Sequence, residues 1–200
     1  MPRFRVEGEI IQDIALSVSG LLSPKIGGPS VFPPQPEGIW DLPYNDDKWV
    51  VSKGEDRYRR GLYTFIRRTA PNPTMLNFDA TSRENCTVRR VRTNTPLQAL
   101  TALNDPEFFE AAQALAKRVT SEAGPQKGTR ATLAFRLCLG RNPKPDELDR
   151  MLSWEQKERQ FFEEHRDDAV RIAGTPDPGL AAWTMLSNVL LNLDETLTKE

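Results

Sequence analysis

The stretch from residue 95 to residue 106, Thr-Pro-Leu-Gln-Ala-Leu-Thr-Ala-Leu-Asn-Asp-Pro, decides the fold class of this chain. Thr95 is a favourable N-cap, the proline after it fits the first helical position, and Gln98 stands where a capping box requires it. Asp105 and the proline after it repeat the start signal. The stretch therefore predicts two consecutive helices with a bend between them.

Outward from this stretch, apolar residues recur at helical spacing along most of the chain. They predict helices over residues 5–22, 57–69, 95–104, 105–120, 129–139, 145–162 and 177–197. The assignment at 57–69 has a competitor, because Leu62 to Ile66 could instead form a short strand. The last helix carries a stripe that fits core packing better than partner binding, made of Trp183, Leu186, Leu190, Leu193 and Leu197. We expect a mainly α protein, an irregular helical bundle of about six or seven helices.

Residues 23–56 interrupt this helical pattern with six prolines and four aromatic residues. The aromatic residues are Phe32, Trp40, Tyr44 and Trp49. A flexible linker has little use for such side chains, so we expect a long, ordered, extended Pro/aromatic-rich segment laid over the core. Trp40, Trp49 and the later Tyr63 are the candidate aromatic contact surface.

The length of 200 residues fits one domain, and we expect residues 1–200 to form a single domain. Residues 1–94 would hold the first helix with the Pro-rich and Arg-rich segments, and residues 95–200 the helical bundle. The N-terminus has no apolar region of a signal peptide, and a helical pattern begins within its first residues. We therefore expect the chain to start inside a larger protein.

Several function classes are disfavoured by composition. A net charge of −1 gives no general bias toward nucleic acid or membranes, and no stretch approaches the length of a membrane span. His165 is the single histidine and lies in a polar run, which argues for an exposed helix end and against zinc sites or a Ser-His-Asp triad. The lone cysteines Cys86 and Cys138 could be buried thiols or a disulfide. We expect no catalytic or metal-binding residues.

The most unusual segment is residues 57–92, which contains nine arginines, no lysine and only two acidic residues. Its net charge is +7, while the rest of the chain carries −8. Guanidinium groups suit carboxylates, phosphates and sulfates, and they tolerate burial in ion pairs. One interpretation is structural, with the arginines fixing irregular backbone to acidic helices. The other is an anion- or partner-binding site made of Arg59, Arg60, Arg67, Arg83, Arg89, Arg90, Arg92 and Asn94.

Two further interpretations of the same region are weaker. A hydrolase would need Asp79, Glu84 or Asp105 to converge in a pocket, and nearby arginines should keep such carboxylates ionised. Nucleic-acid binding is disfavoured because no reading helix or known motif accompanies the charge. Asn94 precedes the helix start at Thr95, where unpaired amides could bind an anion, but local capping by Thr95, with Asn94 in a turn, explains it better.

Several runs of this sequence resemble one family closely. They are Ser19–Leu22 with Gly27–Ser30, Pro33–Gly38, Tyr58–Phe65, Phe78–Ala80 with Ser82–Glu84, Thr93–Leu100, Leu103–Pro106, Ala182–Trp183 and Leu191–Glu195. Together they are similar to the planctomycete-specific domain of unknown function 1553. Members of that family are usually large exported proteins, in which cytochrome-c-like haem modules, a second domain of unknown function and sometimes lectin-like modules precede this domain.

The resemblance implies context rather than chemistry, since the family supplies no catalytic residues to carry over. It implies an extracytoplasmic location, periplasmic or secreted, and a position as the C-terminal part of the domain. No CxxCH sequence is present, so covalent haem would belong to upstream modules and we expect no cofactor in this chain. The leading hypothesis is a non-catalytic scaffold or interaction module whose partners are upstream domains. The alternatives are a binding module for anionic, sulfated or carboxylated polysaccharide, and an uncharacterised hydrolase.

Overall fold

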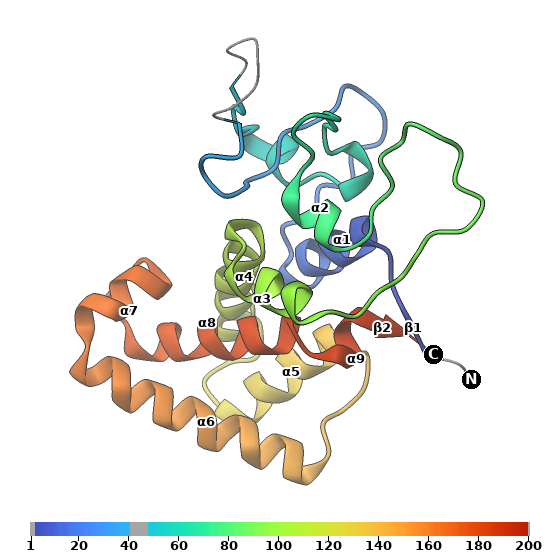
Figure 1. Ribbon diagram of the computed structural model, residues 1–200. Helices are drawn as coiled ribbons and strands as arrows, with labels where there is room; N and C mark the ends of the chain where they lie inside the picture. The colour runs from blue at the N-terminus through green and yellow to red at the C-terminus, as the bar shows by residue number, and fades with distance from the viewer. Residues whose placement is uncertain (1–2, 41–47, 200) are drawn as a thin grey trace. The chain divides into compact units, whose positions relative to one another are not determined.

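The computed structural model describes residues 3–40 and 48–199 (Figure 1). These residues contain nine α-helices, two short 3-10 helices and one two-stranded sheet, which confirms the predicted mainly α class. The helices are more numerous than the six or seven predicted, because several short ones carry little periodicity. Within the described ranges, no helix has the length and apolar character needed to cross a membrane.

The chain folds into two compact units. The first comprises Met1–Ser17, Leu21–Phe109 and Leu197–Glu200, and the second comprises Val18–Gly20 and Glu110–Thr196. The single domain expected from sequence stays a prediction, since compactness does not show whether either unit folds alone.

The first unit combines short elements with long irregular connections. Its elements are β1 (Phe4–Arg5), most of α1 (Gly8–Ser19), the 3-10 helices η1 (Gly54–Tyr58) and η2 (Gly61–Tyr63), α2 (Pro73–Asn77), α3 (Pro96–Asn104), the start of α4 (Pro106–Glu122) and β2 (Thr198–Lys199). β1 and β2 pair antiparallel, so the chain is extended where a helix from residue 5 was predicted. At the start of α3, Thr95 and Gln98 form the predicted capping box.

The helix predicted over residues 57–69 is wrong, and so is the competing strand. The chain there makes η1 and η2, with isolated parallel bridges from Arg59 to Ser23 and from Thr64 to Val31. A close approach to α1 explains the irregularity. A Cβ at the buried Gly61 would lie 2.8 Å from the carbonyl oxygen of Glu9, and the Gly61 amide donates to the Asp13 carboxylate at 2.7 Å.

Aromatic packing orders the described part of the Pro/aromatic-rich segment. Phe32 stacks on Phe65 with ring centroids 4.9 Å apart, and Trp49 meets Phe32 edge-on at 5.0 Å. Trp40 contacts Trp49 at 5.3 Å, and the Trp49 indole donates to the carbonyl of Pro33 at 2.8 Å. These contacts fit the expectation of an ordered segment, and Tyr44 lies outside the described residues.

The second unit is built from regular helices. It holds most of α4, then α5 (Lys127–Leu139), α6 (Pro145–Glu164), α7 (Arg166–Ala173), α8 (Pro178–Leu191) and α9 (Asp194–Leu197) up to Thr196. α8 packs along α6 and α7, as Figure 1 shows, and also contacts α5. Core residues include Phe162, Ala169, Ala173 and Ala181. Of the predicted stripe, only Leu193 is not fully buried.

Two predictions for this unit need correction, the extent of the last helix and the absence of a helix after His165. The last helix does not run from 177 to 197, because α8 ends where the amide of Asn192 bonds back to carbonyls of the last turn, and α9 begins at Asp194. His165 ends α6 as an exposed residue, as predicted, and its ring stacks on Phe161. A further helix, α7, follows it and was missed.

Both cysteines are free thiols. Cys86 is exposed and Cys138 is buried.

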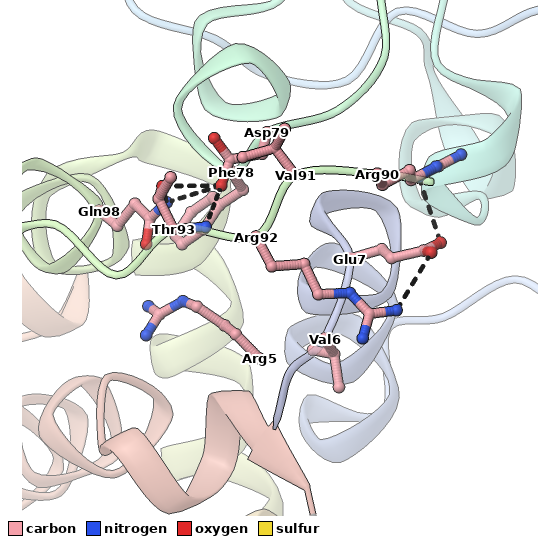
Figure 2. A pocket seen from close by; sticks show the side chains of 10 residues that line it. All are labelled: Arg5, Val6, Glu7, Phe78, Asp79, Arg90, Val91, Arg92, Thr93 and Gln98. Carbon is pink, nitrogen blue, oxygen red and sulfur yellow. Dashed lines mark hydrogen bonds and ion pairs between the residues drawn. The ribbon is translucent and has the colours of Figure 1, made fainter. Parts of the chain in front are cut away.

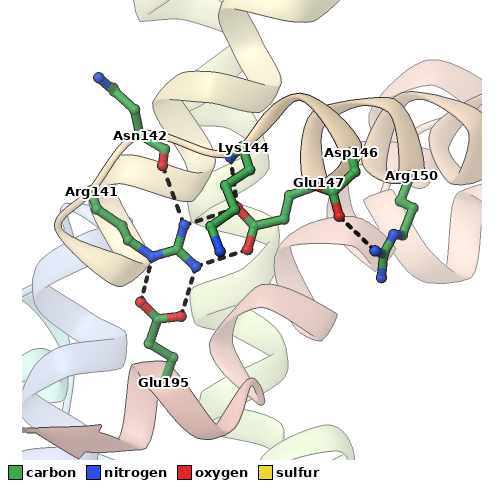
Figure 3. Close-up of polar contacts among 7 residues, drawn as sticks. All are labelled: Arg141, Asn142, Lys144, Asp146, Glu147, Arg150 and Glu195. Atoms are coloured by element: carbon green, nitrogen blue, oxygen red, sulfur yellow. Dashed lines mark hydrogen bonds and ion pairs between the residues drawn. The ribbon is translucent and has the colours of Figure 1, made fainter.

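One arginine ties two helix starts together in the second unit (Figure 3). Arg141 donates to both oxygens of Glu147 at 2.8 Å and to both oxygens of Glu195 at 2.6 and 2.9 Å. The Arg141 hydrogen bonds, helped by the amide of Lys144, lower the pKa of Glu147 to about 2. Such bidentate contacts pair opposite charges and also fix the relative orientation of the guanidinium and carboxylate groups.

Candidate functional site

The predicted site residues of the Arg-rich segment lie in the first unit, and four of them belong to one surface loop. We call residues 79–93 the Arg loop. Its base is closed by Asp79, whose carboxylate accepts from the amide and the hydroxyl of Thr93, both at 2.7 Å (Figure 2). Gln98 is fully buried and donates to the Thr93 hydroxyl at 3.0 Å. The loop therefore has a defined start and end, as compact surface loops do.

The same Gln98 has two functions in the fold. Its side-chain oxygen completes the capping box at Thr95, while its amide nitrogen also donates to the carbonyl of Asn77 at 2.9 Å. Asp79 has a positive φ of 58°, a left-handed conformation that this network holds in place. The sequence indicated the cap at Thr95 but not the loop closure, because closure depends on residues distant in the chain.

The returning limb of the Arg loop is fixed to α1 by ion pairs. Arg90 contacts Glu9 at 2.7 Å and Glu7 at 3.2 Å, and Arg92 reaches Glu7 at 3.6 Å. Figure 2 shows both guanidinium groups turned toward the Glu7 carboxylate. The hydrogen bond to Glu9 raises the pKa of Arg90 further. Arg92 also lies over the ring of Phe4, 5.1 Å from its centroid.

The cavity enclosed by these groups is very small. Its volume is about 10 Å³, and its lining residues are Arg5, Val6, Glu7, Phe78, Asp79, Arg90, Val91, Arg92, Thr93 and Gln98 (Figure 2). A space of this size is about that of one water molecule. Arg90 and Arg92 pair with Glu7, and Asp79 adds a second negative charge to the lining, so both the volume and the charge balance disfavour an anionic ligand in this cavity.

Arg59 is the most deeply placed of the predicted site residues. Its side chain is 1% exposed, and its guanidinium donates to the backbone carbonyls of Lys25, Gly27 and Pro29 at 3.2, 2.5 and 3.2 Å. It also lies 3.7 Å above the centroid of the Tyr63 ring. We call this arrangement the Arg59 cage, and it leaves no room for an external ligand.

The remaining predicted residues are more exposed, and most have partners. Arg60 pairs with Asp13 at 2.8 Å, and Arg83 lies 3.9 Å from Glu9. The Asn94 side chain accepts a hydrogen bond from Arg5 at 2.9 Å. Arg89 differs from these, because it is exposed and its side chain has no partner among residues 3–40 and 48–199.

The aromatic side chains predicted to form a contact surface mostly pack against other residues of the first unit. Trp40 and Trp49 are half-buried against each other, and Arg67 lies over the Trp40 ring at 4.8 Å. The Tyr63 hydroxyl accepts from the amide of Gly27 at 2.8 Å. Arginines do lie beside aromatic rings here, as a polysaccharide site requires, but these stacks fill space within the unit.

The three carboxylates considered for hydrolysis lie in different surroundings. Asp79 closes the Arg loop, and Glu84 is an exposed residue 3.5 Å from Arg68. Asp105 is buried, accepts from the Thr74 hydroxyl and caps the Glu107 amide at 2.8 Å. Burial raises the pKa of Asp105, against the opposing effect of these hydrogen bonds.

Sequence reasoning missed two kinds of feature. Val88 and Val91 are 103% and 70% exposed on the Arg loop, where valine would ordinarily indicate core. A cavity in the second unit is lined by basic residues from three helices, and their wide separation in the chain hid it. The signal that could have pointed to it is Gly179, a glycine in the first turn of α8.

Within residues 3–40 and 48–199, no group of three or more His, Cys, Asp or Glu side chains is arranged to hold a metal ion.

Comparison with known proteins gives one result. No curated protein and no solved structure matches this chain. A family model described as "PSD1: Protein of unknown function (DUF1553)" matches residues 1–155, which include α1, the Arg59 cage and the whole Arg loop. The chain therefore belongs to the PSD1 family of proteins of unknown function, DUF1553.

Proposed function

We propose that this chain is a non-catalytic interaction module of a larger extracytoplasmic protein, and that it contacts an upstream domain of that protein through the Arg loop. The observation that carries the proposal is the contrast within the loop. Its base and one limb are fixed by Asp79, Arg90 and Arg92, whereas Val88 and Arg89 project without partners among the residues that the structure describes. An anchored loop that displays an apolar and a cationic side chain is preorganised for a protein contact.

The non-catalytic part of the proposal rests on how the polar groups are used. Asp79, Glu9 and Asp105 each accept hydrogen bonds that hold the fold together. The single histidine is exposed at a helix end and its Nδ1 lies 2.8 Å from the Phe161 carbonyl oxygen. General acid–base chemistry needs groups within reach of a substrate, and these groups are engaged in structural contacts. The extracytoplasmic location rests on the family resemblance described above.

Site-specific crosslinking tests the contact directly. A photo-crosslinking residue at position 88 in the parent polypeptide, expressed in its native cell, should give a crosslinked peptide encoded upstream in the same gene. The same residue at position 157, on the exposed Lys157 of α6, is the matched control and should not give that peptide. Absence of the upstream crosslink at position 88, or a parent gene without an upstream domain, contradicts the proposal.

Binding of anionic polysaccharide is the second candidate. The observation that favours it is the exposed Arg89, which has no partner in the described part of the chain. Here the wild-type chain should bind a sulfated polysaccharide, and added salt should weaken the binding. Arg89→Gln should remove most of it without changing the circular dichroism spectrum. Arg150→Gln, which changes an arginine that is 79% exposed on α6, is the control for general charge.

A further inference from the structure

The second unit contains a cavity of about 500 Å³ that none of the candidate functions uses. This volume falls within the usual range of small-molecule sites. Residues of α4, α5, α6 and α8 surround it, so regular helices hold its walls in place. The lining side chains include three cations and one acid, and the full set is Lys117, Thr120, Arg130, Arg159, Asp177, Gly179, Leu180 and Trp183.

The three cations are not fully neutralised by the protein. Lys117 is exposed, and its ammonium has no partner among the described residues. Arg130 donates to the carbonyls of Gly124 and Thr120, at 2.6 and 3.5 Å, but has no carboxylate partner within residues 3–40 and 48–199. Arg159 binds the fully buried Glu155 at 3.0 Å, and Lys127 binds the same carboxylate at 2.8 Å. Positive charge is therefore in excess around the cavity.

Trp183 packs at the wall of this cavity. Its side chain is 1% exposed and lines the cavity, yet its indole N–H has no acceptor within the described part of the chain. Buried N–H groups in native proteins nearly always have an acceptor, and an unpaired one is destabilising. The indole nitrogen itself has less than 1 Å² of accessible surface, so it does not open to the cavity, and Trp183 serves as a reporter of binding nearby rather than as a donor.

Gly179 makes the space for the guanidinium group of Arg159. It lies in the first turn of α8 and has an ordinary helical backbone, so conformation does not require glycine there. A Cβ at position 179 would lie 2.8 Å from Nη2 of Arg159 and 3.1 Å from its Cζ. The positive end of the α8 dipole is at this turn and adds to the positive potential.

We propose that this cavity is an oxyanion site, which binds a sulfate or phosphate group through Lys117, Arg130 and Arg159. A tetrahedral oxyanion offers acceptors in several directions, which suits donors that come from three helices. The site is independent of the Arg loop, since it lies in the other unit and shares no residue with it.

Titration of the 200-residue chain with sodium sulfate and, separately, sodium phosphate tests the proposal. Ionic strength is held constant with sodium chloride, and binding is followed by calorimetry and by the indole N–H signals in NMR. We expect saturable binding and a shift of the Trp183 indole signal. Lys117→Gln should weaken binding about tenfold, the effect of losing one charge-assisted hydrogen bond. Lys157→Gln, an exposed lysine of α6 outside the cavity, should leave binding unchanged.

A second variant tests the geometry rather than the charge. Gly179→Ala should displace the guanidinium of Arg159 and weaken binding, while the helical content stays at the wild-type level. The anion with the lower dissociation constant identifies the chemistry of the natural ligand. The proposal is overturned if neither anion binds saturably, if acetate binds as tightly as both, or if Lys117→Gln binds as well as the wild type.

Discussion

Arginine has a structural role throughout the first unit, whereas in the second unit it both joins helix ends, as Arg141 does, and lines a cavity. In the first unit, guanidinium groups hold irregular backbone in place, as Arg59 does with three carbonyls and Arg90 with two carboxylates. In the second unit, regular helices pack through apolar residues, and Arg130 and Lys117 line a cavity without acidic partners among the described residues. The comparison teaches that many arginines close together in a sequence can serve to hold irregular backbone in place. A few cations that are far apart in the sequence can instead form a binding site when regular helices bring them to one cavity.

The largest expected effect tests whether arginine supports the first unit. Arg59→Met should lower the free energy of unfolding by about 3–5 kcal/mol, because three carbonyls lose a charged donor in a buried position. Arg59→Lys should recover little of this, since an ammonium lacks the planar arrangement of donors. Urea unfolding followed by circular dichroism measures both. Arg68→Met, at an arginine that is 76% exposed, is the control, and equal losses at the two positions would break the comparison.

A second test concerns the buried acid of the first unit. Asp105→Ala should cost about 2–4 kcal/mol, since it removes the cap of α4 and leaves the buried Thr74 hydroxyl without its acceptor. Asp105→Asn keeps a cap and an acceptor and should cost about 1 kcal/mol. Thermal unfolding of the two variants side by side gives the difference. A similar loss for both would mean that the negative charge, and not the hydrogen bonds, is what matters.

The Arg loop allows a matched pair of neighbours to be compared. Arg90→Gln should destabilise the protein by about 1–2 kcal/mol, because it removes a charge-assisted hydrogen bond to the nearly buried Glu9. Arg89→Gln should change stability by less than about 0.5 kcal/mol, since this side chain has no partner among the described residues. Chemical denaturation resolves the two. If Arg89→Gln were the more damaging variant, the assignment of structural and displayed residues in the loop would be reversed.

The smallest effect concerns pH and the second unit. The folded pKa of Glu147 is lowered to about 2, below its ordinary value near 4.5. Its contribution to stability is therefore complete above pH 4.5 and is lost as pH falls toward 2. Glu147→Gln should flatten the pH dependence of unfolding in that window, whereas the exposed Glu163→Gln should not. An unchanged slope in Glu147→Gln would show that the Arg141 pair is formed equally in the unfolded chain.

Local signals allowed much of the second unit to be predicted from sequence. Periodicity and the proline at position 145 predicted α5 and α6 closely, since both are long and amphipathic. The break before α9 and the whole of α7 were missed, because four- and eight-residue helices carry little periodicity. In the first unit, α2 was missed although Asn72 and Pro73 form a cap-and-proline start, the same signal that was recognised at Thr95.

The candidate site was less accessible from sequence. The arginines themselves were evident, and so was the alternative that they bind acids and carbonyls. Which arginine has which partner depends on residues far away in the chain, as with Arg90 and Glu9 or Arg60 and Asp13. Single-sequence patterns describe only near neighbours, so they could not separate the displayed Arg89 from the anchored Arg90.

The Arg59 cage also bears on the order of folding. The carbonyls of Lys25, Gly27 and Pro29 converge on the guanidinium of Arg59, and Gly27 and Gly28 in this turn have positive φ values. In the unfolded chain these carbonyls stay hydrated, so we expect this turn to become ordered only after residues 54–63 have delivered the guanidinium. Because the Arg59 side chain is buried, trypsin should cleave after Arg59 only when the cage opens. The rate of cleavage after Arg59 should therefore report how often its guanidinium group leaves the three carbonyl groups of the cage.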